Sequence, residues 1–87
     1  MYRIVKILDK NGNNKEDFFA EVKARHPNMS GEILYQELIR VGGCFCLKWD
    51  DDSESMLRTS AIEEYENDHG KVKVVTRNSI YYLEEIK

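Results

Sequence analysis

The spacing of apolar residues changes at the glycine pair Gly42-Gly43, and this change constrains the fold more than any other feature of the sequence. Before the pair, apolar residues recur every three to four positions, as they do on one face of a helix. After it, Phe45, Leu47 and Trp49 alternate with cysteine and lysine, which is the period of a half-buried strand. A mostly helical half followed by a strand-rich half predicts an α+β fold.

The N-terminal half begins with an apolar stretch, Tyr2–Leu8, that predicts a strand followed by a turn over residues 9–13. Asn14 is placed to cap a first helix that Pro27 ends, and Ser30 is placed to cap a second helix that ends at the glycine pair. We therefore expect a two-helix hairpin, with the N-terminal strand added at one edge of a sheet.

The C-terminal half predicts four strands, because runs of β-branched and aromatic residues are separated by polar turns. These strands are expected over residues 45–49, 56–66, 71–77 and 79–85, and their short connections predict an antiparallel meander. No repeat or linker divides the chain, so residues 1–87 are expected to form a single domain. In this domain the N-terminal strand and the two-helix hairpin pack on a C-terminal four-stranded antiparallel meander or small barrel.

The charge is divided unevenly along the chain. The net charge of −3 is the sum of +2 over residues 1–48 and −5 over residues 49–87. The acidic second half argues against direct nucleic-acid binding, and leaves only the first half for a basic patch. No stretch approaches the about 20 apolar residues of a spanning helix, and Arg3 and Lys6 interrupt the N-terminal apolar run. We therefore expect a cytoplasmic protein without membrane span or signal peptide.

The two cysteines, Cys44 and Cys46, are separated by one residue, a spacing that strains a mutual disulfide and places both on one face of a strand. We expect both to be reduced. His26 and His69 lie far from them and lack the paired spacing of zinc ligands, so no metal or other cofactor is expected. No nucleophile and base occur in a recognisable motif, and we expect a protein without enzymatic activity.

Polar residues within and between the last expected strands are the candidate ligand-binding residues. Guanidinium, hydroxyl and amide groups at neighbouring strand ends can converge on a phosphate or a nucleobase. The set comprises Arg58, Thr59, Ser60, Thr76, Asn78, Ser79 and Tyr81. The alternative is structural, because threonines suit cross-strand pairs, Asn78 and Ser79 suit a turn, and Arg58 can pair with a neighbouring glutamate.

The acidic run after Trp49 is the candidate partner-binding segment. Exposed aromatic side chains anchor protein interfaces, and clustered carboxylates steer a partner electrostatically. The expected partner-binding residues are Trp49, Asp50, Asp51, Asp52 and Tyr82, with Tyr81 as a further exposed anchor. The same run can instead bind a cation, imitate nucleic-acid phosphates or form a solvated hairpin turn.

The motifs Trp49-Asp50, Leu57-Arg58-Thr59-Ser60 and Thr76-Arg77-Asn78-Ser79 resemble the C-terminal pattern of small proteins encoded by phages and prophages of Firmicutes. The resemblance covers the chain from Trp49 onward. It implies a phage or mobile-element protein that acts in the host cytoplasm, where short accessory proteins of this kind inhibit bacterial antiviral defence. It brings no functional residues with it.

Two functions are therefore expected. In the first, the polar set sequesters a phosphorylated nucleotide signal, at an interface between copies of the chain because one small domain rarely encloses a ligand alone. In the second, the protein is an anti-CRISPR-like inhibitor that binds a host defence nuclease complex through its aromatic and acidic residues. The remaining alternative is a housekeeping interaction domain whose polar strands form a solvated sheet face.

Overall fold

The computed structural model describes residues 1–86 as one antiparallel sheet of seven strands with one α-helix. The elements are β1 (Tyr2–Leu8), α1 (Glu16–Arg25), β2 (Ser30–Leu34), the 3-10 turn η1 (Gln36–Leu38), β3 (Cys46–Trp49), β4 (Met56–Arg58), β5 (Ile62–Asp68), β6 (Lys71–Thr76) and β7 (Ile80–Glu85). The chain is mostly β, so the predicted α+β class holds only in outline. Within these residues, no helix is long and apolar enough to span a bilayer.

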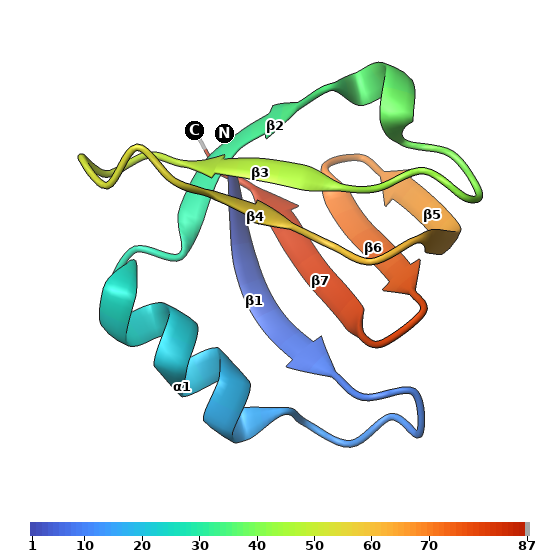
Figure 1. Cartoon of the computed structure of the whole chain (residues 1–87), viewed down its shortest axis with the longest axis horizontal. Coiled ribbons are helices and arrows are strands. Elements are labelled where there is room, and N and C mark those ends of the chain that lie inside the picture. The colour runs from blue at the N-terminus through green and yellow to red at the C-terminus, as the bar shows by residue number, and fades with distance from the viewer. Residues whose placement is uncertain (87) are drawn as a thin grey trace.

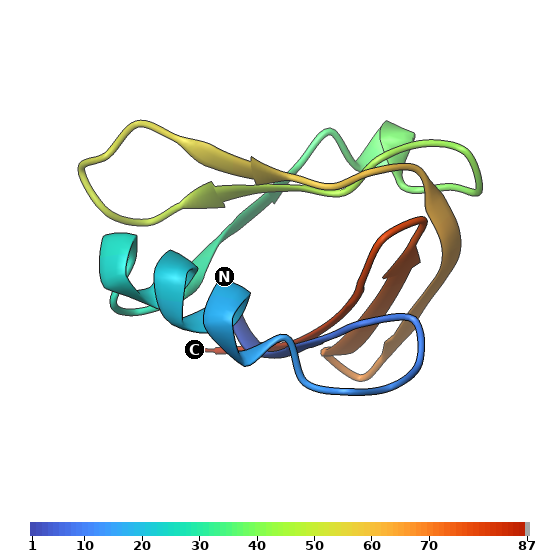
Figure 2. The ribbon, with the colours of Figure 1, turned by 60° about the horizontal axis from the view of Figure 1, so that its bottom comes forward.

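The sheet is rolled onto itself. Its strand order is β4-β3-β2-β1-β7-β6-β5, and all neighbours are antiparallel. The layer of β2, β3 and β4 crosses over the layer of β1, β7, β6 and β5 (Figure 1). The layers meet where the Gly43 carbonyl oxygen accepts a hydrogen bond from the Ile62 N–H (2.8 Å). On the other side they diverge, and α1 lies in the opening (Figure 2).

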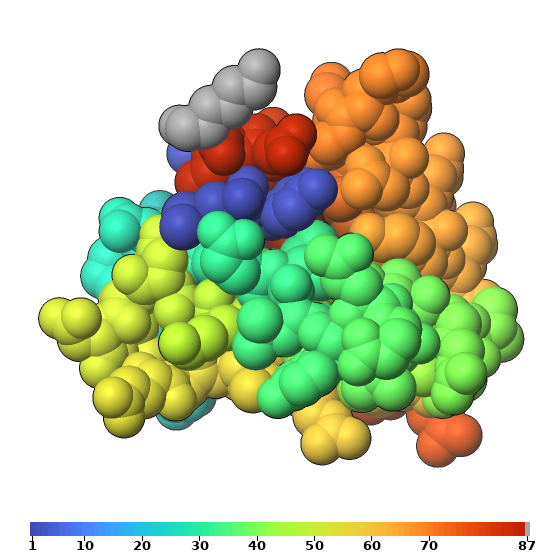
Figure 3. All heavy atoms as spheres, turned by 90° about the horizontal axis from the view of Figure 1, so that it is seen from above, coloured from blue at the N-terminus to red at the C-terminus, as the bar shows by residue number. Residues whose placement is uncertain are grey.

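The predicted second helix is wrong, because residues 30–34 form β2 and residues 36–38 form η1 instead. Gly31 pairs with both β1 and β3, and a Cβ atom there would stand 2.0 Å from the Lys48 carbonyl oxygen. Glycine thus permits the close approach of β3. Tyr35 follows with a left-handed backbone (φ 53°) at the start of η1. Figure 3 shows this green segment across the middle of the face, with the yellow β3–β4 turn to its left. Strand pairing overrides the helical spacing here.

Two predictions about the strands are also wrong. β1 is a central strand between β2 and β7, not an edge strand. The strand expected over residues 56–66 is divided into β4 and β5, which lie at opposite edges of the sheet. The division occurs at a corner where the Thr59 hydroxyl accepts a hydrogen bond from the Phe45 N–H (3.0 Å) and donates one to the Ser60 carbonyl oxygen (2.9 Å). The expected meander therefore becomes two units, β3–β4 and β5–β6–β7.

The hydrophobic core fills the space between the two layers of the roll. Alternate residues of both layers point inward, as the period of two requires. The buried cluster comprises Ile4, Ile7, Met29, Phe45, Leu47, Trp49, Ile62, Val72, Val74, Tyr81 and Leu83. From α1, Phe18, Phe19 and Val22 pack against this cluster while staying partly exposed. The helix closes the core with one face and leaves apolar surface beside β1.

Candidate functional site

Two hydroxyl groups of the predicted ligand-binding set, those of Thr59 and Thr76, are used within the fold. The Thr59 hydroxyl holds the corner between β4 and β5. The Thr76 hydroxyl donates to the Ser79 carbonyl oxygen (3.0 Å) and accepts from the Ser79 N–H (3.1 Å), which closes the β6–β7 turn. All three residues are buried. The structural alternative therefore explains this part of the set.

The other members of the set do not share one surface. Arg58 and Thr59 line a shallow pocket of about 390 Å³ together with Arg40, and the remaining members lie outside its lining. Asn78 is exposed in the β6–β7 turn, and Ser60 is half-buried at the corner. Tyr81 is buried, and burial raises the pKa of its phenol. The structure thus places two of the seven predicted ligand-binding residues on a common pocket.

The predicted aromatic anchors are mostly inside the protein. Trp49 is only 4% exposed, and its ring stacks on His26 with centroids 4.2 Å apart and an angle of 11° between the planes. Tyr81 faces the core, so the prediction that these two side chains are exposed is wrong. Tyr82 is half-buried, and its ring lies below the ammonium groups of Lys6 (4.6 Å) and Lys73 (6.0 Å). Of the three aromatics, Tyr82 alone keeps accessible surface.

Two carboxylates of the acidic turn between β3 and β4 form hydrogen bonds with the rest of the fold. The Ser30 hydroxyl donates a hydrogen bond to Asp50 Oδ2 (2.6 Å). His26 Nδ1 lies 2.6 Å from Asp51 Oδ2 at the C-terminal end of α1. The Ser53 hydroxyl and His26 are the main causes that lower the pKa of Asp51 to about 2. These contacts give the turn a structural role and leave Asp52 exposed.

The low pKa of Asp51 makes stability depend on pH. Its folded-state pKa of about 2 lies below the ordinary value of 3.8, so its carboxylate stabilises the fold above about pH 4. This stabilisation is lost as the pH falls through the folded-state value. Urea denaturation between pH 2 and 6 is expected to show the advantage of wild type over Asp51→Asn shrinking below about pH 4. A constant advantage across this range would contradict the assignment, and Asp52→Asn controls for general charge.

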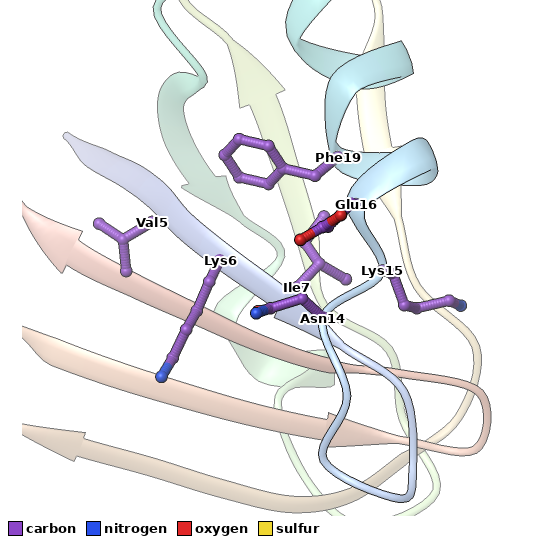
Figure 4. A pocket seen from close by; sticks show the side chains of 7 residues that line it. All are labelled: Val5, Lys6, Ile7, Asn14, Lys15, Glu16 and Phe19. Carbon is purple, nitrogen blue, oxygen red and sulfur yellow. The ribbon is translucent and has the colours of Figure 1, made fainter.

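A groove with an apolar lining lies between α1 and β1. We call it the α1–β1 groove; its narrow part has a volume of about 200 Å³ and is lined by Val5, Lys6, Ile7, Asn14, Lys15, Glu16 and Phe19 (Figure 4). It continues into a second hollow lined by Arg3, Ile4, Val5, Phe19, Lys23, Pro27, Asn28 and Met29. In Figure 4, Phe19 reaches from α1 toward β1, while Lys6 and Lys15 extend in opposite directions. The centre of the groove is apolar and its margins are polar.

A β-bulge in β1 builds the apolar side of the groove. Ile4 is opposite Leu83 and Lys6 is opposite Tyr82, so Val5 is an extra residue without a partner in the register. Val5 is 42% exposed, and it adjoins Lys6, which is exposed as well. Two adjacent outward residues interrupt the alternation of the strand. Sequence reasoning missed the groove, although the Val5-Lys6 pair is the signal that could have indicated a bulge.

The charge around the groove is opposite in sign to that of the whole chain. The two hollows are lined by four basic side chains, from Arg3, Lys6, Lys15 and Lys23, and by one carboxylate, from Glu16. Two of the basic groups are held in place: Lys15 Nζ donates to the Ser79 hydroxyl (2.8 Å), and Arg3 pairs with Glu84 (2.8 Å). Because Glu84 balances Arg3, three basic groups and one carboxylate remain along a groove on a chain of net charge −3. An excess of positive charge attracts anionic groups.

No protein-family model, no curated protein and no solved structure matches the chain significantly.

Proposed function

We propose that this chain is a non-enzymatic binding domain that holds a partner protein in the α1–β1 groove. The observation that carries the proposal is the apolar floor of Val5, Ile7 and Phe19 inside a basic margin. The narrow part, at about 200 Å³, is smaller than the roughly 300–1,000 Å³ of small-molecule pockets. It suits one apolar side chain of a partner segment whose flanking residues are acidic.

The resemblance to phage proteins suggests which partner this is. We propose a bacterial antiviral defence protein, in the host cytoplasm, whose acidic surface segment is covered on binding. Capture then inhibits the defence protein by blocking that surface, without chemical turnover. Basic residues around an apolar anchor speed association and set specificity, which suits an inhibitor that must find its target quickly.

Selection from a display library of random peptides tests the groove directly and needs no identified partner. We expect the enriched peptides to combine Asp or Glu with one large apolar residue. Val5→Asp and Lys23→Glu are expected to weaken the selected peptides at least about tenfold, because they oppose the apolar anchor and the acidic flanks. Fluorescence anisotropy with a labelled enriched peptide measures the loss.

The matched controls lie on other parts of the surface. Val41→Asp changes an exposed valine in the loop before β3, and Lys48→Glu reverses a charge on β3. Both are expected to bind the peptide as wild type does. Equal binding by wild type and Val5→Asp, or enrichment of basic peptides, would overturn the proposal.

A second candidate function is nucleotide sequestration, favoured by the pocket that Arg40 and Arg58 share. Its lining includes the glycine pair Gly42-Gly43 and Thr59, and no carboxylate. Two guanidinium groups that line one pocket suit a phosphate group. This candidate needs a second copy of the chain to enclose the ligand, because the pocket is shallow.

Calorimetry with cyclic dinucleotides and ADP-ribose separates this candidate from the first. Binding tighter than about 10 μM that is lost in Arg58→Ala, together with a dimer in native mass spectrometry, would favour nucleotide sequestration. Binding that Arg58→Ala leaves intact, or no binding, would reject it. The groove variants Val5→Asp and Lys23→Glu serve as controls in this experiment.

A further inference from the structure

The cysteine pair at the start of β3 forms an unusual thiol cluster. The Sγ atoms of Cys44 and Cys46 lie 3.9 Å apart, and neither residue is in a disulfide. Cys44 is half-buried and lines the pocket that holds Arg40 and Arg58, whereas Cys46 is 2% exposed behind it. One thiol is thus reachable from solvent and the other lies directly next to it.

The separation of the sulfur atoms suits joint binding to one metal ion. Thiolates bind zinc at about 2.3 Å. An ion at that distance from both sulfurs, 3.9 Å apart, has an S–metal–S angle of roughly 115°. The two sulfurs can therefore bind one ion together with little movement of the chain. A disulfide needs the sulfurs at about 2.05 Å, so it would require the chain to move.

The charges around the pair distinguish between metals. Two thiolates with a monovalent cation carry a net charge of −1, and a complex of this sign is stabilised by neighbouring guanidinium groups. Arg58 is opposite Cys46 in the β3–β4 register, and it lines the same pocket as Arg40 and Cys44. Zinc takes four ligands in a structural site. Across residues 1–86, no group of three or more His, Cys, Asp or Glu side chains could hold a metal ion. Soft thiolates select Cu(I) among the remaining ions.

We propose that Cys44 and Cys46 form a two-thiolate binding site for a soft monovalent cation of the Cu(I) class, with Arg40 and Arg58 balancing the charge of the complex. Binding replaces the thiol protons with the metal ion. Because both thiols lose a proton when the metal ion binds, affinity is expected to increase as the pH rises from 6 to 8. The site goes beyond partner binding, because it lies on the β3–β4 side of the roll and not in the α1–β1 groove.

Anaerobic competition with the Cu(I) chelator bicinchoninate tests the site on the intact, reduced protein. Wild type is expected to withdraw one Cu(I) per chain from the coloured chelator complex. Cys44→Ser is expected to withdraw none, because a single buried thiol remains. Arg58→Met is expected to weaken Cu(I) binding about tenfold, as loss of an outer-shell partner does at metal sites. Circular dichroism of each variant confirms that it is folded.

The control is His69→Ala, which removes an exposed imidazole remote in sequence from the thiols. It should withdraw as much copper as wild type. The proposal is overturned if wild type withdraws no copper, or if Cys44→Ser withdraws as much as wild type. Cys44→Ser changes the half-buried outer thiol and leaves the buried Cys46 in place. It therefore tests whether both sulfurs are needed to bind the metal ion.

Discussion

Phe45→Ala is expected to lower the free energy of unfolding by about 3–5 kcal/mol. The side chain of Phe45 is 0% exposed, and its ring centroid lies 6.4 Å from that of Tyr65 on β5. It therefore packs the layer of β2, β3 and β4 against the layer of β1, β7, β6 and β5. At roughly 0.05–0.15 kcal/mol per residue, a chain of this size has a total stability of about 4–13 kcal/mol. The substitution removes a large fraction of that total.

Urea denaturation measures this loss as a shift in midpoint. The slope of the transition should stay near the wild-type value, since the unfolded chain exposes nearly the same surface. Tyr35→Ala is the matched control, because it truncates an aromatic ring that is 51% exposed; we expect a change within about 0.5 kcal/mol. A loss below about 1 kcal/mol for Phe45→Ala would show that the layers do not pack through this ring.

Gly31→Ala is expected to destabilise the protein by about 3 kcal/mol, at the upper end of the usual cost of overpacking. The new Cβ atom would lie 2.0 Å from the carbonyl oxygen of Lys48 and 2.7 Å from its carbonyl carbon. Both are backbone atoms of β3, so the clash cannot be relieved by a change of side-chain rotamer. Relief requires separation of β2 from β3 near Gly31 and Trp49, which are opposite each other in the register.

Hydrogen exchange tests this mechanism along with the loss of stability. In Gly31→Ala, amides of β2 and β3 should exchange faster relative to those of β6 and β7 than they do in wild type. Glu32→Ala, at the next and exposed position of β2, should leave both stability and exchange nearly unchanged. Unaltered stability in Gly31→Ala would mean that β2 and β3 leave room for a side chain at this position.

Several elements could be predicted because their signals are local. The apolar alternation of β3, the Pro27 boundary after the first helix, and the turn between β6 and β7 depend on neighbouring residues alone. The region of β2 and η1 could not be predicted in this way. Ile33, Leu34 and Leu38 have helical spacing, yet β2 is a strand because β1 and β3 pair with it on both sides.

The candidate sites show the same limit. The hydroxyls of Thr59 and Thr76 do have structural roles, but they act at a corner and in a turn and not in the cross-strand pairs expected from the preferences of threonine. The buried ring of Trp49 stacks on His26, the residue that follows the C-terminal end of α1. Neither that contact nor the α1–β1 groove can be predicted before the position of α1 relative to β1 and β3 is known.

The sequence by itself determined the first helix, the division into a basic first half and an acidic second half, and that the chain after Gly42-Gly43 forms strands. These properties depend on side-chain period, turn residues and charge, which act over a few neighbouring positions. Only the tertiary structure decided the order of the strands, the central place of β1, and which polar residues face solvent. The physical reason is that burial and strand pairing join residues distant in the chain, and their free energy outweighs local preference.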